Sequence, residues 1–181
     1  MGAKEPQKLL SMDMVENGFL AMSRDPYGHT ITARYGYVAN RNLAIIEMAS
    51  ASGITLVKKE EMNPLLASSY GFGELIADAL DRGCKAFLLG IGGSATNDGG
   101  LGMLTALGFE FYGENDTKIG IDGGSLKDLR SLSVKKAHPK LKEATFQVAC
   151  DVTNPLLGDN GATKVYGPQK GAGPKEQQVL E

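Results

Sequence analysis

Hydrophobic and polar residues alternate along several short stretches of the chain, as they do in strands buried on one face. Residues 31–38 (ITARYGYV) alternate in this way, and residues 43–48 (LAIIEM) form the short apolar run typical of a buried strand. The polar residues 40–42 (NRN) between them suit a hairpin turn. Two further apolar runs, at residues 85–90 (KAFLLG) and 145–150 (TFQVAC), also predict strands.

Helical spacing of apolar residues predicts a helix over residues 73–81. Leu75, Ile76, Ala79 and Leu80 fall on one face of such a helix, and Gly83 stands where its C-terminal stop belongs. A further helix is expected from Pro174 to the end of the chain, because proline is compatible with the first helical position. Residues 1–24 show little periodic pattern.

The middle of the chain predicts a βαβ-like unit. After the strand at 85–90 and a glycine-rich loop, apolar residues favour a short helix over 101–107, and residues 109–112 (FEFY) favour a strand. Residues 113–130 are expected to form an exposed loop or hairpin with its turn at 122–124 (DGG). These elements predict the α/β class, with a mixed sheet and flanking helices.

Composition narrows the classes of partner. With 19 basic and 21 acidic residues and a formal charge of −2, the chain has no basic field for nucleic acid or an anionic membrane surface. No apolar run approaches the roughly 20 residues of a membrane span. Cys84 and Cys150 are far apart and suit neither a disulfide framework nor a zinc site, so we expect buried thiols and, by default, a cytoplasmic protein. A small-molecule partner is therefore expected.

The densest chemical signal is residues 90–100 (GIGGSATNDGG), between a predicted buried strand and a predicted helix. Ligands of open α/β sheets commonly bind beyond the carboxyl ends of strands, as this loop would allow. Its glycines let a ligand approach the main chain, and its polar side chains offer hydroxyl, amide and carboxylate groups that suit a small polyhydroxy acid; these residues are Gly92, Gly93, Ser94, Thr96, Asn97 and Asp98. The residues therefore mark a candidate ligand site.

Two other interpretations of this loop remain open. Asn97 or Asp98 would serve equally as a helix cap, with the glycines needed only for a tight turn. Gly90, Gly92 and Ala95 formally satisfy a dinucleotide-binding fingerprint, with Glu110 at the reach expected of the ribose-binding acid. The poor helix formers after Ala95 weigh against that fingerprint, since there the helix should start at once under the pyrophosphate.

Two later segments also carry candidate residues. Asp151 stands where the last predicted strand ends, and Asn154 precedes a proline that turns the chain, so Asp151 suits either a ligand contact or a turn. A carboxylate there could hold a phosphate-bound Mg²⁺ or accept a hydroxyl proton. Lys170, in the segment 167–172 (GPQKGA), could meet a phosphate or remain a solvated surface lysine.

Taken in order, four segments resemble consecutive motifs of the bacterial glycerate kinases. They are residues 46–53 (IEMASASG), 90–104 (GIGGSATNDGGLGML), 150–158 (CDVTNPLLG) and 166–172 (YGPQKGA). Residues 25–36 and 63–71 add weaker matches, so the resemblance covers about 25–173. Motifs expected near both ends of the family's proteins do not occur, and the family's members are roughly twice as long, so we expect an internal segment of a longer protein.

The resemblance implies an inserted domain of the glycerate kinase fold plus part of its flavodoxin-like domain. Residues 25–150 would be the inserted, substrate-side α/β domain, residues 151–181 a return segment toward the second domain, and residues 1–24 an unmatched N-terminal segment. It also implies ATP and Mg²⁺ dependence, with transfer of the γ-phosphoryl group to a hydroxyl of D-glycerate, the 2-hydroxyl being favoured.

In that role Asp98 and Asp151 would be catalytic. Gly92, Gly93, Ser94, Thr96, Asn97 and Asn154 would bind the substrate, and Lys170 would neutralise phosphate charge. The metal ligands and the oligomeric state are left open. Two alternatives stand beside this hypothesis: a catalytically inert module, and a dinucleotide-binding domain.

Overall fold

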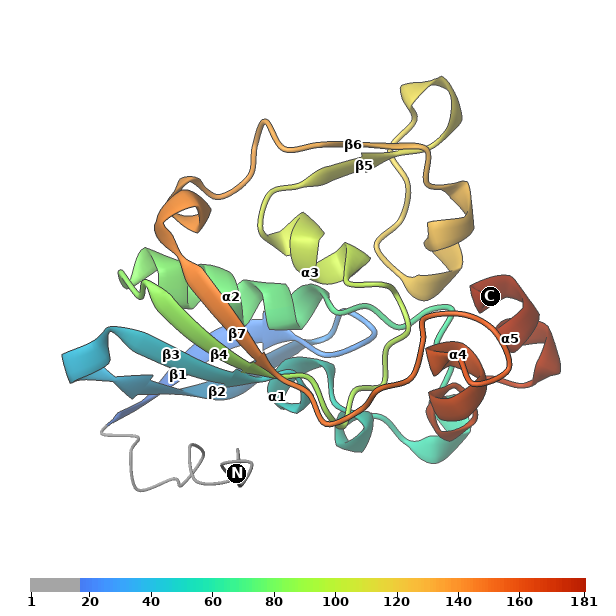
Figure 1. Cartoon of the computed structure of the whole chain (residues 1–181), viewed down its shortest axis with the longest axis horizontal. Helices are drawn as coiled ribbons and strands as arrows, with labels where there is room; N and C mark the ends of the chain where they lie inside the picture. Colours follow the sequence, from blue (N-terminus) through green and yellow to red (C-terminus); the bar gives the residue numbers. More distant parts are fainter. Residues whose placement is uncertain (1–16) are drawn as a thin grey trace, which may run out of the picture.

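The computed structural model describes residues 17–181 and is built around a five-stranded mixed sheet of order β1-β2-β3-β4-β7 (Figure 1). Its strands are β1 (Asn17–Arg24), β2 (Thr30–Val38), β3 (Leu43–Glu47), β4 (Ala86–Gly90) and β7 (Thr145–Ala149). The pairs β1–β2 and β2–β3 are antiparallel, whereas β3–β4 and β4–β7 are parallel. The carboxyl ends of β3, β4 and β7 therefore lie together at one edge of the sheet.

The four strands predicted for this sheet are confirmed, and so is the turn between β2 and β3, where Asn42 adopts a left-handed φ of 49°. The strand β1 was not predicted. Its outward-facing Leu20 and Met22 are 64% and 68% exposed, so its solvent face is as apolar as its inner face and the sequence does not alternate. The structure thus joins residues 17–24 to the same sheet as residues 25–150. Residues 1–16 of the predicted N-terminal segment lie outside the described residues.

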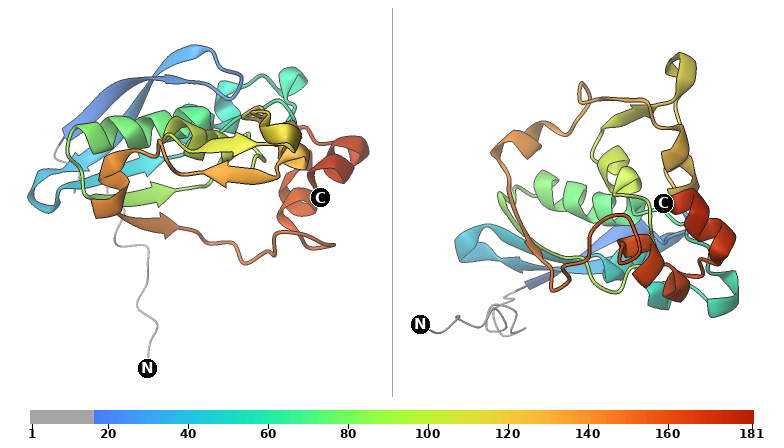
Figure 2. Two further views of the ribbon diagram at one scale, coloured as in Figure 1. Left: turned by 90° about the horizontal axis from the view of Figure 1, so that it is seen from above. Right: turned by 45° about the vertical axis from the view of Figure 1, so that its right-hand side comes forward.

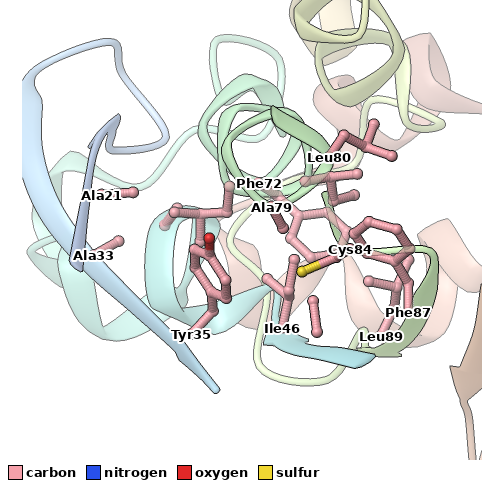
Figure 3. Close-up of a cluster of buried hydrophobic side chains, with 14 of the residues drawn as sticks. Ala21, Ala33, Tyr35, Ile46, Phe72, Ala79, Leu80, Cys84, Phe87 and Leu89 are labelled. Atoms are coloured by element: carbon pink, nitrogen blue, oxygen red, sulfur yellow. The ribbon is translucent and has the colours of Figure 1, made fainter. Parts of the chain in front are cut away.

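One face of the sheet is covered by α2 (Tyr70–Asp81). Phe72, Ala79 and Leu80 of this helix pack on side chains that rise from the strands, among them Ile46 and Phe87 (Figure 3). Burying each large apolar side chain contributes roughly 1.5–3 kcal/mol, so this layer supplies most of the core. The predicted helix is confirmed, although it begins at Tyr70 rather than Gly73.

The short helix α3 (Leu101–Ala106) crosses α2 at very close range. A Cβ atom at Gly73 would overlap the backbone of Met103, and one at Gly102 would overlap Ser68 Oγ and the amide nitrogen of Tyr70. Only glycine permits this approach. The N-termini of α2 and α3 are consequently held side by side next to the carboxyl edge of the sheet.

The prediction of a βαβ-like unit in the middle of the chain is wrong. Strand β5 (Glu110–Tyr112) does not join the large sheet but pairs antiparallel with β6 (Ser131–Ser133) in a separate two-stranded sheet. This hairpin lies on the side of α2 and α3 that faces away from the large sheet (Figure 2). At the predicted turn 122–124, Asp122 instead caps a helical turn by accepting a hydrogen bond from the amide of Ser125.

The C-terminal part forms small helices beyond the carboxyl edge of the sheet (Figure 1). They are α4 (Ala162–Tyr166) and α5 (Pro174–Leu180), and the latter confirms the predicted helix with Pro174 in its first turn. The remaining helix is α1 (Ala49–Ser52), and the 3₁₀ turns are η3 (Ala39–Arg41), η4 (Ile54–Leu56), η5 (Lys59–Glu61), η6 (Glu114–Asp116), η7 (Gly123–Asp128), η8 (Pro139–Glu143) and η9 (Pro168–Lys170).

These elements confirm the predicted α/β class with a mixed sheet and flanking helices. Among residues 17–181, no helix has the length and apolar character to cross a membrane. Cys84 is buried as expected, but Cys150 is exposed because β7, the strand before it, is an edge strand. The proposed domain limits at 24 and 150 stay a prediction.

Candidate functional site

The glycine-rich loop leaves β4 at the carboxyl edge of the sheet and runs through residues 91–100 to α3. Its backbone is held against α1, since the amide of Ala95 donates to the Ser52 carbonyl at 2.9 Å. Three of its glycines have left-handed φ angles that other residues rarely adopt: Gly93 (68°), Gly99 (59°) and Gly100 (80°). The sequence therefore folds this segment into one defined, tightly turned loop.

Asp98 is the interior anchor of this loop. It is 2% exposed, and its Oδ2 accepts hydrogen bonds from the amide and hydroxyl of Ser69, both at 2.7 Å, and from the amide of Gly102 at 3.1 Å. Its Oδ1 accepts from the amide of Gly100 at 3.1 Å. The carboxylate thus binds the N-terminal ends of both α2 and α3, where free amides favour a negative charge. This is the capping interpretation of Asp98, extended to two helices.

Lys170 reaches the same loop from η9. Its Nζ donates to Ser94 Oγ at 2.9 Å and to the carbonyl of Thr96 at 2.6 Å. Burial lowers the pKa of Lys170, and the nearby charge of Asp98 opposes this shift. The lysine is therefore a partly buried cation in contact with neutral oxygens, not a solvated surface residue.

A cavity of about 320 Å³ lies where the loop, α2, α3 and Lys170 meet. It is lined by Met48, Ser69, Phe72, Ile91, Ser94, Thr96, Asn97, Asp98, Gly99, Gly100, Met103 and Lys170. Five predicted site residues are thus brought together here: Ser94, Thr96, Asn97, Asp98 and Lys170. A volume of this size is at the lower end of the range for small-molecule sites.

The other glycines of the prediction lie outside the lining of this cavity. Gly92 is exposed, and a Cβ atom there would meet nothing within 4 Å. Gly93 is also exposed, and its carbonyl accepts a hydrogen bond from the amide of Ile54 at 2.8 Å. Gly93 therefore shapes the loop, whereas Gly92 leaves the backbone open to an approaching molecule. Their predicted role in substrate binding stays a prediction.

The second candidate segment, after β7, is arranged differently. Asn154 Oδ1 accepts a hydrogen bond from the hydroxyl of Tyr166 at 2.7 Å, and its Nδ2 donates to the carbonyl of Asn160 at 2.9 Å. Both ends of this amide are therefore used within the segment. Asp151 is exposed, and within residues 17–181 its carboxylate makes no hydrogen bond or ion pair. Neither residue lines the cavity.

One side chain joins the two candidate segments. Asn97 Nδ2 donates to the buried hydroxyl of Thr163 in α4 at 3.1 Å. Together with Lys170, this bond fixes the C-terminal helices against the glycine-rich loop. The predicted site residues on the two segments therefore belong to one edge of the molecule.

Sequence reasoning missed two polar residues at this edge. Ser69 donates to Asp98 and accepts from the amide of Met103 at 2.9 Å; a serine before a helix start is a capping signal, but the predicted helix began too late to use it. Glu47 ends β3, directly beside Gly90 of β4, and its Cγ would lie 3.6 Å from a Cβ on that glycine. The sequence pattern that could have identified Glu47 is an acidic residue at the end of a buried apolar run.

The dinucleotide-binding alternative does not fit this arrangement. Helix α3 begins at Leu101, well after Ala95, so its N-terminus does not follow the fingerprint directly. Glu110 lies in β5, outside the large sheet, and is paired with Lys118 and Lys136 at 2.7 and 3.1 Å. It is therefore not placed to bind a ribose beside β4.

Comparison with known proteins finds the family that the motifs resemble. The sequence profile described as the glycerate kinase family matches residues 11–181. The chain is 54% identical over 147 residues to a glycerate kinase of Halalkalibacterium halodurans, covering 81% of this chain and 39% of the relative. It is 50% identical over 156 residues to the glycerate 2-kinase of Escherichia coli K12, covering 86% and 40% of the two chains.

A solved structure is similar as well. The crystal structure provisionally named glycerate kinase 2 of Salmonella typhimurium LT2 superimposes with a TM-score of 0.88 at 43% identity, covering 92% of this chain and 46% of that one. The chain spans about two-fifths of the length of the curated relatives it matches. The match over nearly all of its own residues places the chain in the glycerate kinase family.

Proposed function

We propose that this chain carries the acceptor site of a glycerate kinase, which transfers the γ-phosphoryl group of ATP to the 2-hydroxyl of D-glycerate. Within the family, the observation that carries the proposal is the partly buried ammonium of Lys170 in the wall of the cavity. The choice of the 2-hydroxyl follows the name of the Escherichia coli relative, glycerate 2-kinase.

The surroundings of Lys170 leave it in need of an anion. An ammonium has three donors, and Ser94 and Thr96 accept two of them. No ion pair of Lys170 forms within the described part of the chain, and the carboxylate of Asp98 is already bonded to Ser69, Gly100 and Gly102. A carboxylate or phosphoryl oxygen of a ligand would accept the third hydrogen bond and add negative charge to that of the nearby Asp98.

The two aspartates then take different roles. We assign Asp98 as a positioning residue, because its carboxylate is buried and holds α2, α3 and the loop together. Asp151 is the better candidate for contact with the reacting groups, because it is exposed at the carboxyl edge of the parallel strands. In phosphoryl transfer such a carboxylate accepts the hydroxyl proton or contacts a phosphate-bound Mg²⁺.

Use of ATP and Mg²⁺ is part of the same proposal. Residues 17–181 contain no group of three or more acidic, histidine or cysteine side chains that could hold a metal ion. Mg²⁺ is commonly held by substrate phosphates and only one or two carboxylates, and Asp151 could supply such a ligand. When bound, the ion would neutralise charge on the transferred group. A cytoplasmic location remains our prediction for such an enzyme.

The proposal is tested with a chimeric enzyme that contains this chain. The aligned part of the Escherichia coli glycerate 2-kinase would be replaced by this chain, and ADP release would be followed with and without D-glycerate. We expect D-glycerate-dependent turnover within about tenfold of the parent enzyme, equivalent to about 1.4 kcal/mol in the barrier. A folded chimera that releases no ADP would refute the proposed function.

The inert-module alternative is tested on the 181-residue chain alone. The chain spans about two-fifths of its curated relatives, so binding of D-glycerate without turnover is the result expected if other parts of those proteins complete the reaction. D-glycerate-dependent ADP release by the 181-residue chain would rule out that alternative.

A further inference from the structure

The lining of the cavity beside Lys170 includes apolar as well as polar residues. Four of its lining residues are hydrophobic and come from four different segments: Met48 before α1, Phe72 of α2, Ile91 of the loop and Met103 of α3. We call this set the apolar wall. Lys170 is the one cationic side chain in the lining, whose members all lie within the described residues.

A ligand with two negative charges would be poorly matched to this lining. Lys170 can neutralise one carboxylate, but a second carboxylate would find no other cation in the lining, only neutral polar groups, the apolar wall and the buried Asp98. Burying a charge without a counter-ion is costly, and the like charge of Asp98 adds repulsion. A ligand with a single carboxylate, paired with Lys170, avoids the first cost and reduces the second.

We propose that the apolar wall is the specificity determinant of the site, restricting it to hydroxy acids with one carboxylate and rejecting dicarboxylates of the same carbon skeleton. This inference rests on the proposed function, since it concerns the same cavity. It adds the choice between ligands with one and two carboxylates, and it assigns that choice to four hydrophobic residues for which the sequence analysis proposed no function.

Two members of the wall can be changed without removing a fully buried side chain. Ile91 lines the cavity and is 39% exposed, so a lysine there can reach a ligand without burying its ammonium in the core. Met103 is half-buried, and the bond that it makes to Ser69 uses its backbone amide, which any substitution retains. Phe72 is 2% exposed and packs in the core, so its replacement would test folding instead of specificity.

The test is a calorimetric titration of the 181-residue chain with D-glycerate and with tartronate, the dicarboxylate of the same three-carbon skeleton. We expect D-glycerate to bind at least tenfold more tightly than tartronate, since the second carboxylate is left unpaired. Ile91→Lys, and separately Met103→Lys, should reduce that preference roughly tenfold by supplying the missing cation. Leu20→Lys is the matched control, because Leu20 is a 64% exposed apolar residue on β1.

The outcomes separate the inference from the proposed function. Equal affinity of the wild-type chain for both acids would overturn the inference and leave the proposed function standing. A preference that survives in both lysine variants would also overturn it, because the wall would then not be its cause. Failure of the wild-type chain to bind D-glycerate would instead overturn the proposed function.

Discussion

The loops that follow the neighbouring parallel strands β4 and β7 look alike in sequence and differ in structure. Both contain an aspartate and an asparagine close to glycines at the carboxyl edge of the sheet. In the first loop Asp98 is 2% exposed and accepts four hydrogen bonds; in the second Asp151 is exposed. Residue type and position relative to a strand therefore do not show which carboxylate is free to contact a ligand. Burial and hydrogen-bond donors do.

The largest expected difference between the two loops concerns their aspartates. Asp98→Ala should lower the free energy of unfolding by about 3 kcal/mol, because it leaves the buried donors of Ser69 and Gly102 and the half-buried amide of Gly100 without an acceptor. Asp151→Ala should change it by less than about 0.5 kcal/mol. Urea unfolding followed by circular dichroism measures both values.

Turnover in the chimeric kinase completes this comparison. Asp151→Ala should reduce turnover by about 10²-fold or more if that carboxylate contacts the reacting groups. Asp98→Asn, which keeps an acceptor oxygen, should recover part of the stability lost in Asp98→Ala. An Asp98→Ala protein of normal stability but without turnover would reverse the two roles.

Glycine substitutions sharpen the contrast in packing. Gly102→Ala should cost about 2–3 kcal/mol, because its Cβ would overlap Ser68 Oγ and the Tyr70 amide where α3 crosses α2. Gly158→Ala, in the second loop, would meet nothing within 4 Å, and only its left-handed φ of 93° makes alanine unfavourable, by about 1 kcal/mol. Thermal unfolding of the two variants measures both losses of stability. Equal losses would mean that steric contact between α2 and α3 does not control the first loop.

The link between the loops should have a smaller effect. Asn97→Ala removes the hydrogen bond to Thr163 and should destabilise the protein by about 1 kcal/mol. Because Thr163 is buried in α4, we expect faster amide hydrogen exchange in residues 162–166 and little change in α2. Uniform exchange rates in the variant and the wild type would show that the bond does not couple the loops.

The smallest expected effect is on pH dependence. Burial lowers the pKa of Lys170, so between that value and the ordinary lysine value the unfolded chain binds more protons than the folded chain. The contribution of Lys170 to the free energy of unfolding should therefore rise with pH through this window, and anion binding should weaken there as the ammonium is lost. Burial raises the pKa of Cys84, which acts in the opposite direction at alkaline pH, so the contribution of Lys170 is measured as the difference between the wild type and Lys170→Met. Unfolding and binding measured from pH 7 to 11 provide the check.

The sequence predicted the elements whose hydrophobic pattern is one-sided or continuous. The sequence-based prediction failed for elements whose position depends on contacts between residues far apart in the chain. Strand β1 has apolar residues on both faces, and β5 leaves the large sheet because its partner is β6, a pairing that local periodicity does not encode. The start of α2 was placed late because Gly71 looks unfavourable in a helix, although its close contact with Arg24 requires a glycine there.

The candidate site was predicted only in part, because some of its residues come together only through tertiary contacts. The polar side chains of the glycine-rich loop and Lys170 were identified, and the structure places five of them around one cavity. The apolar wall could not be found, because Met48, Phe72, Ile91 and Met103 look like ordinary core residues and converge only in the folded chain. The burial of Asp98 was equally invisible, since it depends on Ser69, a residue 29 positions away.

The most direct measurement of the central claim is a titration of D-glycerate into the wild-type chain and into Lys170→Met at pH 7. The account predicts saturable binding by the wild type and an affinity about 10-fold to 100-fold lower in the variant, the loss expected for one charged hydrogen bond. Circular dichroism would confirm that the variant is folded. Equal affinity in the two proteins, or no binding by the wild type, would contradict the assignment of Lys170 as the anchor of the acceptor site.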